Sequence, residues 1–268
     1  MGAIMRRLIL FPCAGKTLVG TLDEATGSTG LLIVSGGNEI RAGAHRGMAE
    51  LAADLAAQGI PVLRFDRRGI GDSSGQNPGF AQSAPDIAAA AATFVAEAGI
   101  ARLVAFGNCD AASALALFHT AAGIDSLVLA NPWVGTGSDD SMPAGAAIRA
   151  RYAEKLKDPR EWLRLASGGV NLGKIAKGLR KASATPSKAE NTLIGDMATG
   201  IAGCRTTVLL AERDNTAIAF RDAWRRLPAP PPVTIESLDS ASHSFASAGD
   251  KAWLRERLIA TVQAYAAG

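Results

Sequence analysis

The stretch that decides the fold reads Leu103-Val104-Ala105-Phe106-Gly107-Asn108-Cys109-Asp110-Ala111-Ala112. Its first residues form an apolar run that is typical of a buried strand, and its last residues are small and typical of a packed helix. Cys109 stands between the two, and the small residues Gly107 and Ala111 on either side suit a strained turn. The stretch therefore predicts a strand, a sharp turn that carries a cysteine, and a helix.

This arrangement matches the nucleophile elbow G-x-S-x-G, with cysteine in place of serine and Ala111 in place of the last glycine. The helix begins directly after Cys109, so its free N–H groups and its dipole favour a thiolate and a developing oxyanion. A free cysteine is most often a buried and inert thiol, and that interpretation applies to Cys13 and Cys204. For Cys109 the strand–turn–helix context favours a nucleophile.

Around the elbow, strand and helix patterns alternate from residue 31 onward, after two short strands at Arg6–Phe11 and Thr17–Asp23. The predicted later strands are Leu31–Ser35, Pro61–Phe65, Arg102–Phe106, Ser126–Ala130, Thr206–Leu210 and Val233–Leu238. The predicted helices are Ala44–Ala57, Ser83–Ala98, the segment from Cys109 to about Ala121, Ala217–Arg226 and Asp250–Ala266. The alternation predicts an α/β fold with a mostly parallel, doubly wound sheet.

The interval 133–200 interrupts this alternation, because it is too long for a simple crossover and has helical patterns of its own, at Ala146–Leu156 and Trp162–Leu165. We interpret it as a helical cap inserted into a core formed by residues 1–132 and 201–268. From Arg149 to Lys188 it holds 11 lysine and arginine residues against three acidic ones. A basic cap favours an anionic substrate or carrier, and solvated helix faces are the alternative.

A thiol nucleophile needs a base, and the base needs an acid that orients it. In elbow-type sites the chain order is nucleophile, acid, histidine. His243 lies in the loop before the last helix and fits that order, whereas His119 lies about 15 Å along the elbow helix, at 1.5 Å per residue. Asp214 follows the strand Thr206–Leu210 and is the preferred acid, with Glu212 as the alternative.

An oxyanion hole needs two backbone donors. The first is the N–H of Asp110, and the second comes from the loop after Leu31–Ser35, where we prefer Gly37, with Asn38 as the next choice. A tight turn is the other interpretation of the Gly36-Gly37 pair. We expect the Asp110 carboxylate to point away from the thiol or to bind this loop, because an inward carboxylate would raise the thiol pKa. The candidates for lining the substrate pocket are Asn38, His45 and Trp133, and for His45 a place on the surface is the preferred alternative.

Composition limits the remaining function classes. Of the 268 residues, 48% are hydrophobic and 20% are charged, which indicates a folded globular chain rather than disorder. The net charge of +3 does not indicate a globally basic nucleic-acid-binding protein. Three cysteines without metal-ligand spacing predict reduced thiols and no metal site. The apolar runs Leu8–Phe11 and Ile87–Ala98 are too short for a signal peptide or a membrane span, so we expect no membrane insertion.

Taken together, these features resemble the α/β-hydrolase superfamily over nearly the whole chain outside the predicted cap. The segment Phe65-Asp66-Arg67-Arg68-Gly69-Ile70-Gly71-Asp72-Ser73 is similar to the D-x-R-G-x-G-x-S loop of that superfamily, which supports the active site and is not itself catalytic. A cysteine elbow is found in dienelactone-hydrolase-like and some thioesterase-like relatives.

A narrower resemblance is to the exosortase A system-associated hydrolase 1 family. The matching segments are Ser35-Gly36-Gly37-Asn38-Glu39-Ile40-Arg41-Ala42-Gly43, Gly107–Leu115, Ala130-Asn131-Pro132-Trp133-Val134 and Gly169-Val170-Asn171-Leu172. This resemblance implies a cytoplasmic hydrolase tied to surface polysaccharide or protein sorting, and it supplies no substrate.

The resulting hypothesis is acyl transfer through a covalent thioester on Cys109, with His243 as base and Asp214 as its partner. It needs no cofactor, and it implies an ester or thioester substrate that is either a small molecule or linked to a carrier. The alternatives are an acyltransferase that uses the same residues and a non-catalytic scaffold or binding protein. Nucleic-acid binding lacks a motif and interleaved aromatic residues.

Overall fold

The computed structural model describes residues 5–135 and 188–266. In this part of the chain, eight strands form one sheet in the order β1-β2-β4-β3-β5-β6-β7-β8. Strands β1 and β2 form an antiparallel hairpin, β2 pairs antiparallel with β4, and the remaining neighbours are parallel. The strands are β1 (Arg6–Cys13), β2 (Lys16–Asp23), β3 (Thr29–Val34), β4 (Val62–Asp66), β5 (Arg102–Asn108), β6 (Ser126–Ala130), β7 (Arg205–Ala211) and β8 (Thr234–Leu238).

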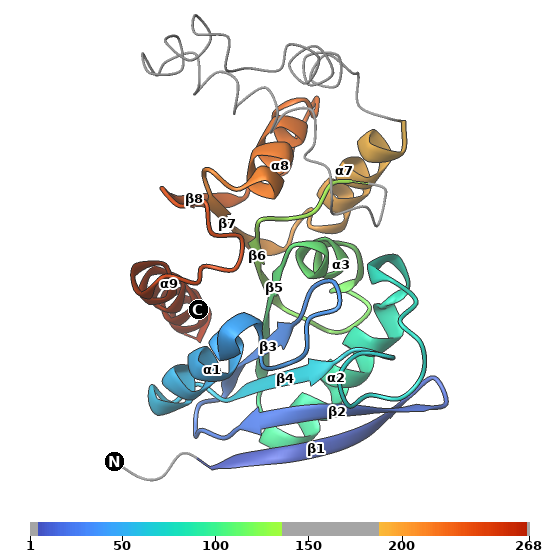
Figure 1. Ribbon diagram of the computed structural model, residues 1–268, viewed down its shortest axis with the longest axis vertical. Helices are drawn as coiled ribbons and strands as arrows, with labels where there is room; N and C mark the ends of the chain where they lie inside the picture. The colour runs from blue at the N-terminus through green and yellow to red at the C-terminus, as the bar shows by residue number, and fades with distance from the viewer. Residues whose placement is uncertain (1–4, 136–187, 267–268) are drawn as a thin grey trace, which may run out of the picture.

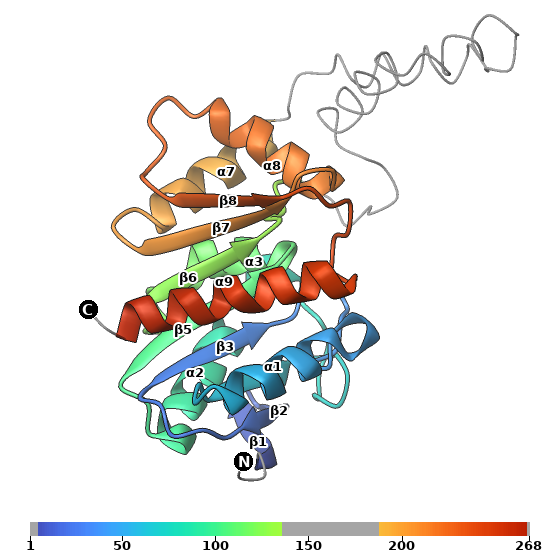
Figure 2. The same cartoon turned by 90° about the vertical axis from the view of Figure 1, so that its left-hand side faces the viewer.

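Helices cover both faces of the sheet (Figures 1 and 2). One face carries α1 (Gly47–Ala57) and α9 (Ala248–Ala266), which close a core with β3, β5 and β6. The other face carries α2 (Ala84–Ala98), α3 (Asp110–Phe118), α7 (Lys188–Gly200) and α8 (Asn215–Arg225) over a second, larger core. The predicted doubly wound α/β-hydrolase fold is therefore confirmed.

The fold differs most from its predicted elements at the start of α1. The expected helix Ala44–Ala57 begins at Gly47, because His45 and Arg46 adopt positive φ angles of 51° and 60°. Residues 44–46 form a 3-10 turn instead, and Glu39 accepts a hydrogen bond from the N–H of Ala44 at 2.6 Å. Periodicity alone extends a helix over such a turn, because the apolar spacing of α1 continues through it.

Most of the predicted cap lies outside the described residues. That holds for the helical patterns at Ala146–Leu156 and Trp162–Leu165, for the basic side chains from Arg149 onward, and for the segment Gly169–Leu172. The last part of the interval, α7, packs closely on α3, since a Cβ added to Gly200 would lie 2.2 Å from the carbonyl oxygen of Ala116. Of the helices that the structure describes, none combines the length and apolar character needed to cross a membrane.

The parallel strands direct their carboxyl ends to one edge of the sheet. The loop after β3, the turn after β5, the chain after β6 and the loops after β7 and β8 meet there. In open α/β sheets this edge is where ligands bind. The topology therefore gathers residues 35–46, 109, 131–133, 212–214 and 239–247 around one position.

Candidate active site

Cys109 occupies a strained turn between β5 and α3. Its backbone angles are φ 60° and ψ −127°, in a region that non-glycine residues rarely adopt, at a cost of about 1–3 kcal/mol. Gly107 is required beside it, because a Cβ there would lie 2.8 Å from the carbonyl carbon of Ala111 and 2.9 Å from the nitrogen of Ala112. The predicted strand–turn–helix stretch thus has the geometry that exposes a side chain at the sheet edge.

Backbone contacts with the chain after β6 hold the turn in place. The N–H of Cys109 donates to the Ala130 carbonyl at 3.0 Å, and the Cys109 carbonyl accepts from the N–H of Trp133 at 3.1 Å. Helix α3 begins at Asp110, so the thiol lies at the N-terminus of a helix. The helix dipole there stabilises negative charge on the sulfur.

The structure brings His243 and Asp214 to this thiol from two other loops. The Nδ1 atom of His243 lies 3.1 Å from Oδ2 of Asp214, and the Cys109 side chain interacts with the same ring and favours its protonated form. Asp214 caps α8, where the same Oδ2 accepts from the N–H groups of Thr216 at 3.0 Å and Ala217 at 3.1 Å. We call this arrangement the Cys109–His243–Asp214 row.

The alternatives considered for the base and the acid lie elsewhere. Glu212 pairs with Arg221 at 3.3 Å. His119 is buried within its own helix, where its Nδ1 lies 3.2 Å from the Leu115 carbonyl oxygen, and burial lowers its pKa.

The pKa of His243 is set by its partners, whereas the pKa values of Cys13 and Cys204 are set mainly by burial. Burial by itself would lower the pKa of His243, but its hydrogen bonds to Asp214 and Cys109 and the charges of these groups outweigh burial and raise the pKa to about 10. The ring is therefore an imidazolium at neutral pH, positioned between a carboxylate and the sulfur. In contrast, burial raises the pKa of Cys13 to about 11 and also raises that of Cys204.

The loop after β3 (residues 35–46, the β3 loop) reaches the elbow through Gly37. The N–H of Gly37, one of the two predicted oxyanion donors, donates to Oδ1 of Asp110 at 2.6 Å. The carboxylate of Asp110 therefore binds this loop, as expected. Buried Arg67 donates to the Gly37 carbonyl at 2.6 Å and lies 3.7 Å from Oδ2 of Asp110. A Cβ at Gly36 would lie 2.8 Å from the Asp110 carboxylate, so only glycine leaves room for this contact.

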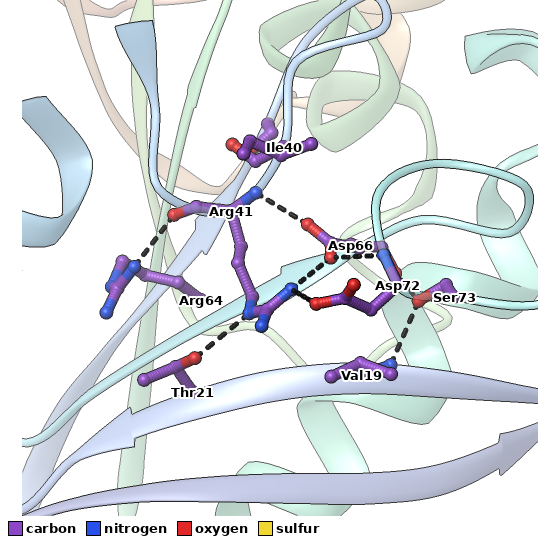
Figure 3. Close-up of polar contacts among 9 residues, drawn as sticks. Val19, Thr21, Ile40, Arg41, Arg64, Asp66, Asp72 and Ser73 are labelled. Atoms are coloured by element: carbon purple, nitrogen blue, oxygen red, sulfur yellow. Dashed lines mark hydrogen bonds and ion pairs between the residues drawn. The ribbon is translucent and has the colours of Figure 1, made fainter. Parts of the chain in front are cut away.

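Buried charges hold the other end of the β3 loop against β2 and β4 (Figure 3). Fully buried Asp66 accepts hydrogen bonds from the backbone N–H of Arg41, at 2.6 Å, and from the Arg41 guanidinium. That guanidinium also lies 2.9 Å from the Asp72 carboxylate and donates to Thr21 at 3.0 Å. Arg64 donates to the Arg41 carbonyl at 2.8 Å. Asp66, in the predicted D-x-R-G-x-G-x-S segment, thus anchors the loop that carries Gly37.

The three pocket candidates differ in their contacts with the Cys109–His243–Asp214 row. Trp133 is partly buried and bonded through its backbone to Cys109. Asn38 and His45 are exposed, and Asn38 accepts a hydrogen bond from Asn77 at 3.1 Å. No hydrogen bond or ion pair joins either of them to the row among the described residues.

Two asparagines at the site were given no role by the sequence patterns. Asn108 and Asn131 both donate to the backbone carbonyl of His243. The available signal was a polar residue directly after each of two apolar strands, which marks the functional edge of a parallel sheet. Within the described ranges, no group of His, Cys, Asp and Glu side chains is arranged to hold a metal ion.

Comparison with known proteins supports the fold that carries this site. A family model described as "Serine aminopeptidase, S33" matches residues 30–191, which include the elbow and precede Asp214 and His243. An esterase of Pyrococcus furiosus superposes with a TM-score of 0.65 at 15% identity, covering 97% of this chain and 91% of the esterase.

Two further solved structures are similar over their length. A hydrolase of Agrobacterium vitis has a TM-score of 0.59 at 17% identity, with 97% of this chain and 100% of that chain covered. A serine hydrolase without a lid from Xanthomonas campestris has a TM-score of 0.59 at 14% identity, with 99% and 96% covered. At these identities the structural likeness shows the fold alone. A search of curated proteins finds no match.

Proposed function

The chain belongs to the serine aminopeptidase, S33, family of α/β hydrolases, and we propose that it cleaves an ester or thioester with Cys109 in the place of a serine nucleophile. His243 acts as the general acid and the general base, and Asp214 orients its ring and stabilises the protonated form. One observation carries the proposal: Cys109 lies in a strained turn at the N-terminus of α3, where its side chain interacts with the His243 ring, which is itself hydrogen-bonded to the Asp214 carboxylate at 3.1 Å.

The reaction proceeds in two halves. The Cys109 thiolate attacks the substrate carbonyl, a C–S bond forms, and the carbonyl electrons move onto oxygen. When the carbonyl reforms, the bond to the leaving alcohol or thiol breaks, and the His243 imidazolium gives that group its proton. Neutral His243 then takes a proton from water as the water oxygen attacks the thioester. Cleavage of the C–S bond releases the carboxylic acid and restores the thiolate and the imidazolium.

Two backbone N–H groups stabilise the oxyanion, those of Asp110 and Gly37. The N–H of Gly37 donates to the Asp110 carboxylate at 2.6 Å, so the substrate oxygen has to displace that carboxylate to use it. Support for this assignment comes from the position of Gly37 directly opposite the elbow, where Gly36 lies against Asn108 and Cys109.

The acyl acceptor distinguishes hydrolysis from transfer. An acyl group on sulfur passes readily to amines, thiols or alcohols as well as to water, so the same row supports an acyltransferase. The eleven basic residues between Arg149 and Lys188 favour an anionic carrier, and the resemblance to the exosortase-associated family favours a substrate of an exopolysaccharide system. A scaffold that has kept the fold without chemistry would form no acyl-enzyme.

Intact-protein mass spectrometry after brief exposure to activated esters and acyl thioesters tests the proposal. We expect a mass increment of one acyl group that decays with time in the wild type and in Cys13→Ala, and no increment in Cys109→Ala. Faster decay on addition of an amine, thiol or alcohol would identify a transferase. An increment that persists in Cys109→Ala, or none in the wild type across the panel, would overturn the assignment of Cys109.

A further inference from the structure

The backbone carbonyl of His243 is held by two side-chain amides. The Nδ2 atoms of Asn108 and Asn131 each donate to this oxygen at 3.1 Å. The Nδ2 of Asn131 also lies 3.3 Å from Oδ1 of Asn108, so the two amides contact each other. The His243 side chain is 40% exposed, so these contacts hold the residue by its backbone carbonyl and not by its ring.

Asn131 connects all three segments that carry the row. Its Oδ1 accepts from the N–H of Ala211 at 2.9 Å, three residues before Asp214, and its own N–H donates to the Leu209 carbonyl at 2.9 Å. Its Nδ2 reaches Asn108, directly before the nucleophile, and the histidine loop (residues 239–247). Because Ala211 supplies a donor, Oδ1 has to face β7, and this leaves Nδ2 for His243.

The backbone of Asn131 is special as well. The residue is fully buried and has a φ of 39°, and asparagine is one of the few side chains that tolerate this left-handed region. A buried amide whose donor and acceptor are both used is a rigid connection, since each lost hydrogen bond would leave a polar atom unsatisfied.

We propose that Asn131, together with Asn108, is a positioning residue that fixes the main chain of His243 so that its ring lies between Asp214 and the Cys109 sulfur. The inference rests on the proposed function in one respect, that this ring serves the thiol. Fixing the carbonyl fixes the peptide plane and the Cα–Cβ direction of His243, and small displacements of a catalytic group cost large factors in rate. Both donors are neutral, so they orient the ring without competing for its proton.

The test is the pH dependence of Cys109 alkylation by iodoacetamide, followed by intact mass. Alkylation requires the thiolate but no acyl chemistry, so it reports on the pairing of sulfur and imidazolium even if no ester is a substrate. The variants are Asn131→Gly, which tolerates the positive φ and removes the donor to His243 without adding a charge, Asn108→Ala, and the double variant. Ser126→Ala is the matched control, because buried Ser126 also bonds across to β7, at 2.9 Å from the Arg205 carbonyl, at the far end of β6.

We expect the double variant to alkylate at least about tenfold more slowly than the wild type at pH 6 and equally fast at pH 10, because an unpaired thiol ionises near pH 8.5. Each single variant loses one of two donors and should fall by roughly threefold at pH 6. Ser126→Ala should keep the wild-type profile even if its melting temperature drops.

An unchanged pH profile in the double variant would overturn the positioning role. If Asn131→Gly does not fold, Asn108→Ala carries the test alone, and an unchanged profile there has the same meaning. Failure of the proposed function gives a different pattern, in which the wild type is never acylated by esters although its alkylation profile still responds to loss of the two amides.

Discussion

Two loops bring chemical groups to Cys109, and they are anchored by different chemistry. The β3 loop is fastened by buried charges, above all by the pair of Arg41 and Asp66 (Figure 3). At the His243 carbonyl the histidine loop is held by neutral groups, the amides of Asn108 and Asn131. Charged groups hold only its start, where the Ser240 hydroxyl donates to the Asp250 carboxylate at 2.6 Å and Asp239 pairs with Arg213 at 2.8 Å.

The difference shows where a protein can place full charges near a reactive thiol. A fixed charge beside the imidazole would shift its pKa, whereas a neutral amide holds the backbone and leaves the pKa to the intended partners. In the histidine loop those partners are Asp214 and Cys109. In the β3 loop the charges of Arg41 and Asp66 are paired with each other, so we expect them to stabilise the fold and not to alter the pKa of His243. We therefore expect loss of the Asp214–His243 pair to affect mainly the reactivity of Cys109. Loss of the Arg41–Asp66 pair should affect mainly the stability of the fold.

The largest effect is expected from Asp214→Asn. Asparagine is as good a helix cap as aspartate, so α8 should still begin at residue 215, while the His243 ring loses its anionic partner. The rate of Cys109 acylation should fall by about 10²- to 10⁴-fold. The free energy of unfolding at neutral pH should also fall, because the charged ring loses a partner that stabilises it in the folded state. The rates come from the mass-spectrometric assay, with Glu212→Gln as a control that leaves them unchanged.

The same variant gives a pH signature. The folded-state pKa of His243 is raised to about 10, so the stabilisation by its charged ring is fully present below the unfolded value of about 6.5 and is lost as pH rises through about 10. In Asp214→Asn the ring should titrate at a lower pH, as followed by NMR of the histidine ring protons. A wild-type ring that titrates near its ordinary value would contradict the ion-paired row.

Asp66→Ala should act on stability first. It leaves two backbone N–H groups without their acceptor, and the partly buried Arg41 guanidinium keeps only Thr21 and the exposed Asp72 as partners. The free energy of unfolding should therefore fall by about 3 kcal/mol in urea titrations. The double variant Asp66→Ala with Arg41→Met should recover part of this loss, because no buried charge is left unpaired. If the double variant loses as much as both single variants added together, the pair is not the anchor.

The smallest effect is expected from Asp110→Ala, at the point where the β3 loop meets the elbow. Acylation develops an oxyanion that needs the N–H of Gly37, whereas alkylation does not. Removing the carboxylate frees that N–H, so the ratio of acylation by an activated ester to alkylation by iodoacetamide should rise by roughly 3- to 10-fold. A lower ratio would mean that Asp110 holds Gly37 in its working position.

Much of the fold could be predicted from the sequence, because the relevant signals are local. Apolar runs, the small residues around Cys109 and the alternation of strand and helix report on short segments, and parallel sheets then place all strand ends at one edge. For that reason the positions of Cys109, His243 and Asp214 could be predicted without any knowledge of contacts. Their catalytic roles stay a proposal.

Tertiary structure alone decided what depends on contacts between distant segments. Glu212 and Asp214 follow the same strand two residues apart, and only the path of the loop places one against His243 and the other against Arg221. The Asp110 carboxylate on the N–H of Gly37 and the amides on the His243 carbonyl join residues 73 and more than 100 positions apart. A linear pattern reports which segments become strands and helices, but hydrogen bonds between loops depend on distances that exist only after the sheet has formed.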